Sequence, residues 1–315
     1  MNLKDKQQIN TQRAMLELSS PMDYELMMRY IDILCDRYNF LSMNYIGESI
    51  LGRGIPMLTL GNGKKQVVYV GTFSGGEHIC ATVLLRFINE YCEVKKSRGR
   101  IYNYSIDYLF ETRRICVIPM LNTDGVDICI NGVSEDNVLK ERLITMNGGS
   151  RFEDWCANGR GVSLDRNFNS DFLRYRAKSA EQGICSGTSC GFCGEYPESE
   201  PETGALCSNI RYSGDVKAAI ALGLGGEKVY YRTEQKCPIM AKSVAQVISR
   251  ASGYKLQDDM DSEKACGSFF GWCIDELDIP AFGIFCGDEV SKYPSTYFEI
   301  YSRLREVLFT LPALI

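Results

Sequence analysis

The sequence predicts an α/β fold, a single domain in which one mixed, twisted β-sheet has helices on both faces. Short apolar runs of strand character alternate with longer segments whose apolar residues recur at helical spacing. Most of these runs end in polar or glycine-containing turns. The chain of 315 residues contains no repeat, low-complexity tract or long linker that would divide it. Residues 1–19 are expected to form an N-terminal extension and residues 20–315 the domain.

The first helix is expected to start at Ser20 and Pro21. Its apolar face follows at helical spacing and consists of Met27, Tyr30, Ile31 and Leu34. Residues 41–71 then predict three strands separated by turns. The pair Asn62-Gly63 predicts a hairpin between the second strand and the third.

The third strand runs into a glycine-rich turn, "GTFSGGEH", and then into a long amphipathic helix. The apolar stripe of that helix is expected to pack on the sheet and consists of Ile79, Val83, Leu84, Phe87, Ile88 and Tyr91. Further along, "RRICVIPMLNTDG" predicts a buried strand that ends in a polar turn. The segments "VKAAIALGLGGEKVYY" and "DIPAFGIFCGDE" predict central strands.

The remaining helical signals are short. "KCPIMAKSVAQVISRASGY" predicts a helix that ends near Gly253, and helix starts are expected in "SGDV", "PESEPETGAL" and "SFFGWCIDEL". Polar turns follow four strands, at residues 74–78, 122–125, 223–226 and 285–287. Because ligands of open α/β sheets bind beyond the carboxyl ends of the strands, these turns are expected to converge on one crevice.

The composition indicates a soluble globular protein, with 45% hydrophobic and 24% charged residues. The net charge of −5 does not favour nucleic acid or an anionic membrane as a partner. No apolar run approaches the roughly 18 residues needed to span a bilayer. The N-terminus has no apolar region typical of a signal peptide, so a cytoplasmic location is expected, with most of the fourteen cysteines as thiols.

Six segments, in this order, resemble the zinc metallocarboxypeptidases, especially bacterial ones that cut peptides of cell-wall type. The segments are "GTFSGGEHICATVLLRFINEY", "VIPMLNTDGVDICING", "WCANGRGVSLDRNFN", "YPESEPETGAL", "GLGGEKVYY" and "GWCIDELDIPAFGIFCG". The resemblance extends over residues 23–287 and implies the fold of that family. It also implies a zinc ion held by two histidines and one glutamate, with a further glutamate as general base.

Carried over residue by residue, the resemblance places the family's zinc ligands on Ser74, Glu77 and Gly223 and its general base on Phe285. Glycine has no ligand atom, phenylalanine accepts no proton, and a neutral hydroxyl is a poor zinc ligand. A shifted alignment would not restore the site, because it needs two imidazoles and His78 is the only histidine. We therefore expect no cofactor there, with Glu77 as a vestigial ligand and His78 as a partly exposed residue near a helix start.

The family binds a terminal carboxylate through an Asn-Arg pair, which corresponds here to Asp165-Arg166. Arg166 is a candidate for a bidentate contact with a carboxylate. Asp165 would repel an anion or pair with Arg166, so a structural ion pair is the alternative. Arg160 is a second basic candidate for substrate binding, or a structural residue.

A separate thiolate cluster is suggested by Cys185, Cys190 and Cys193, with Cys207 downstream. The C-x₄-C-x₂-C spacing is typical of loops that bind metals through thiolates. A disulfide within the loop and free thiols are the alternatives, and free thiols are the state we expect first.

Three functions follow from these expectations. The first is a carboxypeptidase-like protein that lacks catalysis and binds a peptide, a cell-wall fragment or a protein partner. The second is an active hydrolase with a relocated metal or a cysteine such as Cys286 as nucleophile. The third is a structural or interaction protein whose cleft is filled, with the Phe285 ring occupying volume where water would stand. The sequence does not predict the oligomeric state.

Overall fold

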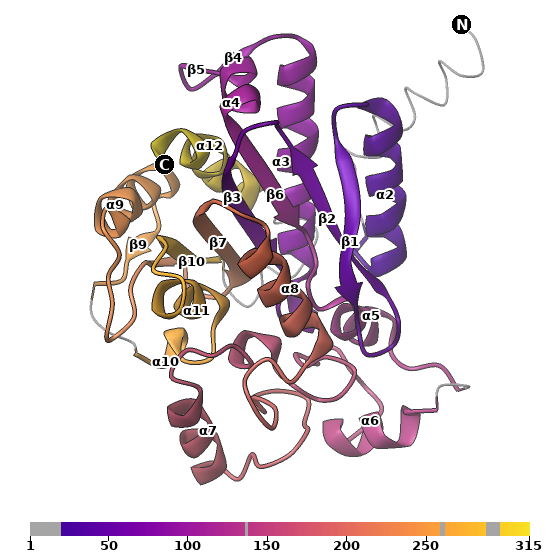
Figure 1. Ribbon diagram of the computed structural model, residues 1–315. Helices are drawn as coiled ribbons and strands as arrows, with labels where there is room; N and C mark the ends of the chain where they lie inside the picture. Colours follow the sequence, from indigo (N-terminus) through magenta and orange to yellow (C-terminus); the bar gives the residue numbers. More distant parts are fainter. Residues whose placement is uncertain (1–19, 136–137, 259–261, 288–296) are drawn as a thin grey trace, which may run out of the picture.

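The computed structural model describes residues 20–135, 138–258, 262–287 and 297–315 (Figure 1). The N-terminal extension expected at residues 1–19 lies outside the described residues. Eight strands form one mixed sheet in the order β1-β2-β6-β3-β7-β10-β8-β9, and β4 pairs with β5 separately. The strands are β1 (Ser42–Glu48), β2 (Gly54–Leu60), β3 (Lys65–Gly71), β4 (Arg100–Ile101), β5 (Tyr104–Ser105), β6 (Arg113–Ile118), β7 (Val216–Leu224), β8 (Lys228–Tyr230), β9 (Lys255–Leu256) and β10 (Ala281–Cys286).

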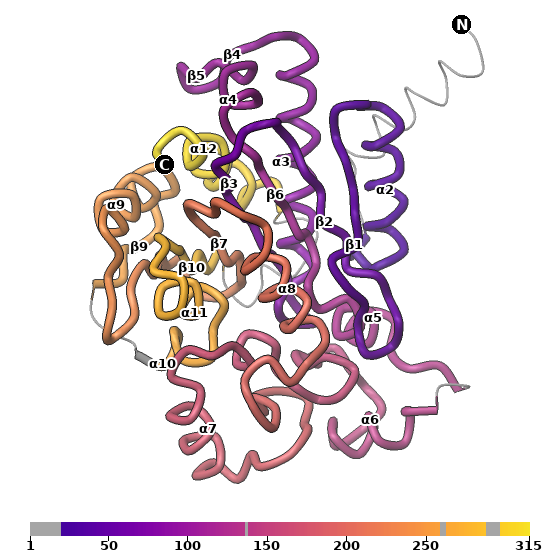
Figure 2. The backbone as a smooth tube through the Cα atoms, in the orientation of Figure 1, coloured from indigo at the N-terminus to yellow at the C-terminus, as the bar shows by residue number. Residues whose placement is uncertain are grey.

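Helices cover both faces of this sheet, so the predicted α/β class is confirmed. The helices and 3₁₀ turns are α2 (Tyr24–Arg37), η1 (Gly75–Glu77), α3 (His78–Lys96), α4 (Ile106–Thr112), α5 (Thr123–Asn131), α6 (Lys140–Asn147), η2 (Leu164–Arg166), α7 (Phe172–Glu181), α8 (Pro201–Tyr212), α9 (Ala241–Ser252), α10 (Ser262–Ala265), α11 (Phe269–Asp275) and α12 (Tyr297–Leu314). Figure 2 shows the backbone before and after α7 running as irregular loops below the sheet.

Alternate residues of the central strands enter two separate cores. Tyr69 of β3 faces the core that contains α2, α3, α9 and α12. Its neighbours Val68 and Val70 face the core that contains α8 and α11. Side chains alternate across a strand, so a strand covered on both faces reads as a continuous apolar run. This explains why "VVYV" carries no alternation in the sequence.

The hairpin predicted at Asn62-Gly63 is wrong, because β6 lies between β2 and β3. β6 pairs antiparallel with β2 and parallel with β3. The turn binds the chain that enters β6: the Asn62 N–H donates to Phe110 O at 2.7 Å and the Gly63 N–H donates to Arg113 O at 3.1 Å. A Cβ on Gly63 would lie 2.1 Å from the backbone of Thr112, so the close approach requires glycine.

Two predicted helix starts also differ from the structure. The first helix begins at Tyr24, three residues after Pro21, because the Asp23 carboxylate caps it by accepting the Leu26 N–H at 2.8 Å. The "SGDV" segment starts no helix: Ser213 caps the end of α8, and Val216 begins β7. The predicted apolar faces of α2 and α3 are buried as expected.

Candidate functional site

The turns that follow β3, β6, β7 and β10 meet at one end of the sheet, as the sequence predicts. The turn after β6 contacts the turn after β3, where the Asn122 side-chain amide donates to Phe73 O at 3.0 Å. The turn after β7 contacts the end of β10, where the Gly225 N–H donates to Cys286 O at 3.1 Å. The structure therefore brings the three segments that carry the family's zinc-ligand and general-base positions together, with the turn after β6 beside them.

Glu77 is held by the backbone on both of its carboxylate oxygens. Oε2 accepts the N–H groups of Phe73 and Ser74, and Oε1 accepts the N–H of Leu224, all at 3.0 Å. Burial raises the pKa of Glu77 to about 7, with a further rise from the nearby Asp165 and an opposing effect of the three N–H donors. The side chain therefore links the turn after β3 to the end of β7.

Gly223 and Phe285 lie directly beside that carboxylate. A Cβ on Gly223 would be 3.0 Å from Glu77 Oε1 and 3.1 Å from the Phe285 ring. The ring packs edge-on against Tyr230, with centroids 5.4 Å apart, and the Lys264 ammonium lies 5.0 Å from its centroid. The remaining space, which we call the Glu77 cavity, is about 20 Å³ and has room for roughly one water molecule.

These residues do not fit a zinc ion of the family's kind. Ser74 contributes at most a neutral hydroxyl, Gly223 contributes no side-chain ligand, and both Glu77 oxygens already accept hydrogen bonds. Throughout the described part of the chain, no group of three or more His, Cys, Asp or Glu side chains could hold a metal ion. His78 begins α3 and is buried, with 7% of its surface exposed, so the expected partial exposure is wrong. It is covered because the first turn of α3 already lies within the folded core.

Arg166 is surrounded by its own chain. Nη1 donates to the carbonyl oxygens of Glu263 at 2.7 Å and Cys266 at 3.0 Å, and the guanidinium lies 4.8 Å from the Tyr175 ring centroid. Nε lies 3.5 Å from the Asp165 carboxylate, and 11% of the Arg166 side chain is exposed. These are the contacts of a structural residue. A role of Arg166 or Asp165 in ligand binding stays a prediction.

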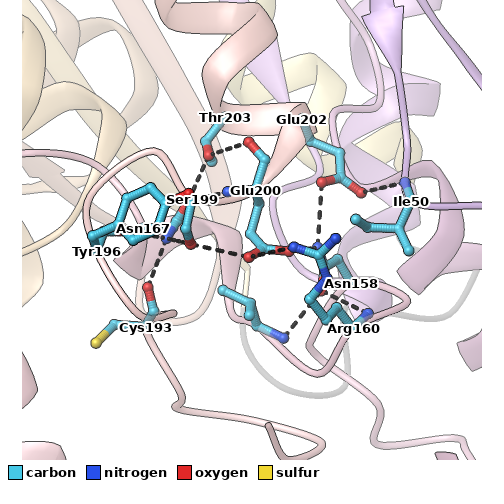
Figure 3. A network of polar contacts seen from close by, with 11 residues as sticks. Ile50, Asn158, Arg160, Asn167, Cys193, Tyr196, Ser199, Glu200, Glu202 and Thr203 are labelled. Carbon is cyan, nitrogen blue, oxygen red and sulfur yellow. Dashed lines mark hydrogen bonds and ion pairs between the residues drawn. The ribbon is translucent and has the colours of Figure 1, made fainter. Parts of the chain in front are cut away.

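Arg160 is exposed and lies beside a buried polar network (Figure 3). Its guanidinium is 3.5 Å from the Glu200 carboxylate. Buried Asn158 organises this loop: its amide donates to Glu200 at 2.8 Å and to Glu202 at 3.2 Å. Its Oδ1 accepts the N–H groups of Arg160 and Val162, both at 3.0 Å. The loop that carries Arg160 is therefore held by its hydrogen bonds to buried Asn158.

A second buried asparagine, Asn167, holds the adjacent loop. Its amide donates to Cys193 O at 2.7 Å, Tyr196 O at 3.2 Å and Ser199 Oγ at 2.9 Å, and its Oδ1 accepts from Glu200 N at 3.2 Å and Thr203 Oγ1 at 2.5 Å. Sequence reasoning missed both asparagines. They lie in the segments that carry the family resemblance, "WCANGRGVSLDRNFN", and this was the signal that could have identified them.

The thiolate cluster suggested by cysteine spacing does not form a metal site in the structure. Cys193 and Cys207 are buried, and Cys207 lies on α8 within the core that contains α8 and α11. Cys185 and Cys190 are exposed, and all four are free thiols. The cysteines are separated because α8 carries Cys207 into the core, whereas the other three follow an irregular surface loop.

Cys190 instead neighbours Cys156, which the spacing argument did not include. The N–H groups of Cys156 and Ala157 donate to Ser189 O at 2.9 Å and 3.0 Å, which places the two segments side by side. A hydrogen bond between the two thiols lowers the pKa of Cys190, and the same contact together with burial raises the pKa of Cys156.

Mild oxidation with diamide is expected to join Cys156 and Cys190, because the Cys190 thiolate has a thiol partner within reach. Diamide takes up the two hydrogen atoms that the thiols lose. Peptide mapping by mass spectrometry should find this linkage in the wild type and in Cys185→Ser, but not in Cys190→Ser. A linkage between Cys185 and Cys190 in its place would contradict the prediction.

Comparison with known proteins agrees with the fold and with the family resemblance of the sequence. A sequence profile described as zinc carboxypeptidase matches residues 27–269, well over half of the chain. The chain belongs to the zinc carboxypeptidase family. The resemblance carried by the six segments is thereby confirmed. The described helices include none that is both long and apolar enough to cross a membrane.

Two curated relatives of this family member cover most of its length. It is 29% identical over 278 residues to gamma-D-glutamyl-L-diamino acid endopeptidase 1 of Lysinibacillus sphaericus, covering 88% of this chain and 68% of the relative. It is 27% identical over 310 residues to the uncharacterized protein YqgT of Bacillus subtilis (strain 168), covering 96% of this chain and 80% of the relative.

Solved structures share the fold at low sequence identity. Bovine thrombin-activatable fibrinolysis inhibitor, in complex with tick carboxypeptidase inhibitor, matches with a TM-score of 0.64 at 18% identity, covering 94% of this chain and 99% of the other. Carboxypeptidase A of Helicoverpa armigera matches with a TM-score of 0.65 at 15% identity, covering 99% of this chain and 81% of the other.

Proposed function

We propose that this member of the zinc carboxypeptidase family binds a peptide or a cell-wall fragment and does not hydrolyse it. The proposal rests on the hydrogen bonds of Glu77. Its two carboxylate oxygens accept hydrogen bonds from three backbone N–H groups. A metal ion would have to displace these hydrogen bonds and would find no imidazole at Ser74 or Gly223. Phe285 cannot take the proton that a general base removes from water.

The ligand class follows from family membership and from a relative. Peptides are what carboxypeptidases act on, and the Lysinibacillus relative is named as an endopeptidase that acts on gamma-D-glutamyl-L-diamino acid linkages. The Glu77 cavity of about 20 Å³ is too small for a peptide side chain. A bound peptide would therefore lie outside this cavity. The same small volume also favours the alternative of an interaction protein whose cleft is filled.

The structure offers little support for a cysteine hydrolase. Cys286 is fully buried, and its thiol donates to Gly223 O at 3.2 Å. A cysteine nucleophile must reach its substrate and needs a neighbouring base to take its proton. A buried thiol that donates to its own backbone meets neither requirement.

Purified protein supplied with equimolar zinc is expected to release no amino acids from peptides, including gamma-D-glutamyl peptides. Loss of the general base alone should lower the rate by about 10²–10⁴. The measurement is amine release with and without a chelator, with Glu77→Ala as the matched control. Chelator-sensitive hydrolysis that Glu77→Ala abolishes would overturn the proposal. Thermal stabilisation by an unhydrolysed peptide would support it, and its absence across a peptide series would favour the filled-cleft alternative.

A further inference from the structure

A second cavity lies away from Glu77, between α6, α7 and the loops that precede α8. Its volume is about 750 Å³, within the usual range for small-molecule sites. Its lining includes Arg142 from α6, Arg160 from the loop that Asn158 organises, and Arg176 from α7. We call it the arginine-lined cavity. None of its lining residues belongs to the Glu77 cavity.

Most of the guanidinium donors in this cavity are not used by the protein itself. Arg142 is exposed and makes no hydrogen bond or ion pair with the rest of the described chain. Arg176 is exposed and donates from Nη1 to Glu195 O at 2.5 Å. Arg160 makes one ion pair, at 3.5 Å, and 47% of its side chain is exposed. Each guanidinium has five N–H donors in a planar fork, so donors remain on all three arginines.

The acidic groups in the wall do not cancel this charge. Glu200 is 2% exposed, and its carboxylate accepts from Asn158 at 2.8 Å and from Ser199 at 3.0 Å. These bonds hold Glu200 in place as part of the wall. Glu195 is the other carboxylate among the lining residues. Three guanidinium groups therefore face two carboxylates, one of which is already hydrogen-bonded inside the protein.

Two loops of the wall are held in place by buried asparagines. Asn167 binds the backbone at Cys193 and Tyr196, on the loop that forms one side of the cavity. Asn158 fixes the backbone at Arg160 on another side. A loop whose backbone is already fixed loses less entropy when a ligand binds, which favours recognition of a small anion.

We propose that the arginine-lined cavity binds a small dicarboxylate or tricarboxylate. Guanidinium forks match planar carboxylates in bidentate geometry, and three forks from separate elements suit a ligand with more than one such group. The inference does not depend on the proposed peptide function, because no residue of this cavity lines the Glu77 cavity. Arg160, the second basic candidate of the sequence analysis, is here assigned to the arginine-lined cavity.

Calorimetry with tricarballylate at constant ionic strength tests this site. We expect saturable binding to the wild type and about tenfold weaker binding to each of Arg142→Gln and Arg176→Gln, as loss of a charge-assisted hydrogen bond predicts. Arg174→Gln is the matched control: it lies on α7 but pairs with Glu234 outside the cavity, and its affinity should equal that of the wild type. The three substituted residues, Arg142, Arg174 and Arg176, are exposed, and thermal melts should show that each variant folds.

Two results would overturn the proposal. One is a failure of the binding test, either because tricarballylate does not bind or because Arg174→Gln weakens its binding as much as the cavity variants do. The other is tighter binding of inorganic phosphate than of tricarballylate, because it would indicate a phosphate site.

An independent readout uses the exposed thiol of Cys185, which lines the cavity. Bound tricarballylate is expected to slow alkylation of Cys185 several-fold, as followed by peptide mass spectrometry. Cys237 is also exposed and lies outside the lining, so its alkylation rate should not change. Equal rates at Cys185 with and without saturating ligand would contradict the assigned location.

Discussion

Replacement of Asn167 by alanine is expected to lower the free energy of unfolding by about 4 kcal/mol. Asn167 is fully buried, and its side chain makes five hydrogen bonds to the loop and helix that follow it. Alanine would leave the carbonyl oxygens of Cys193 and Tyr196 and the N–H of Glu200 without these partners. Each buried group left unpaired costs about 1–3 kcal/mol, less where water can enter.

Urea denaturation measures this change, and Asn169→Ala is the matched control. Asn169 is two residues away and is exposed, and within the described part of the chain it bonds only to the Glu276 side chain. Its replacement should change the stability by no more than about 0.5 kcal/mol. If the two variants lost similar amounts of free energy of unfolding, the hydrogen bonds around Asn167 would not be what stabilises the loop. The Asn167 variant should also be cut faster by protease in residues 190–200, because that loop loses its anchor.

The sheet and its main helices were predictable because their apolar patterns are strong. The stripe of α3 and the continuous runs of β3 and β7 are buried as the sequence implied. The order of the strands was not predictable from local signals. Asn62-Gly63 has the composition of a hairpin turn, but its backbone bonds to the chain entering β6, which is about fifty residues further along the sequence.

The sequence predicted which residues lie at the candidate site, but it did not predict all of the contacts that they make. The histidine count alone excluded a two-histidine zinc site, and the four turns converge as expected. That both oxygens of Glu77 would bind backbone N–H groups could not be read from the sequence, because Leu224 is distant in the chain. The arginine-lined cavity was missed for a similar reason: Arg142 and Arg176 lie on separate helices and belong to no motif.

At this site the chain keeps the fold of its family but not the residues that hold the family's zinc ion. The fold of the family brings the ends of β3, β7 and β10 together, and zinc would normally be bound there. In this chain the same ends are joined by hydrogen bonds of Glu77 and by packing of Phe285 on Tyr230. Backbone hydrogen bonds and an aromatic contact thus occupy the place that the family gives to a metal ion.

Stability is expected to fall as the pH rises from about 4.5 to above 7, because two buried carboxyl groups titrate abnormally. Burial raises the pKa of Glu77 and of Glu202 from the usual 4.5 to about 7. Asp165 adds to the rise at Glu77, and Asp124 adds to it at Glu202. Between these values the folded protein binds protons that the unfolded chain has released, so the free energy of unfolding decreases with rising pH. The decrease should be on the order of 3 kcal/mol for Glu202, and the titration of Glu77 should add to it in the same direction.

Glu202→Gln isolates one of these contributions, because the amide keeps the shape and cannot ionise. The side chain of Glu202 accepts the Ile50 N–H at 3.3 Å and the Asn158 amide at 3.2 Å, and glutamine can retain one of these bonds through its oxygen. Urea melts between pH 5 and 8 should show a shallower decline in stability for this variant, with most of the difference gained above pH 7. Glu181→Gln, on the exposed end of α7, should keep the wild-type slope. If Glu202→Gln also kept that slope, the carboxyl would titrate equally in the folded and unfolded chains, and burial would not explain the pH dependence.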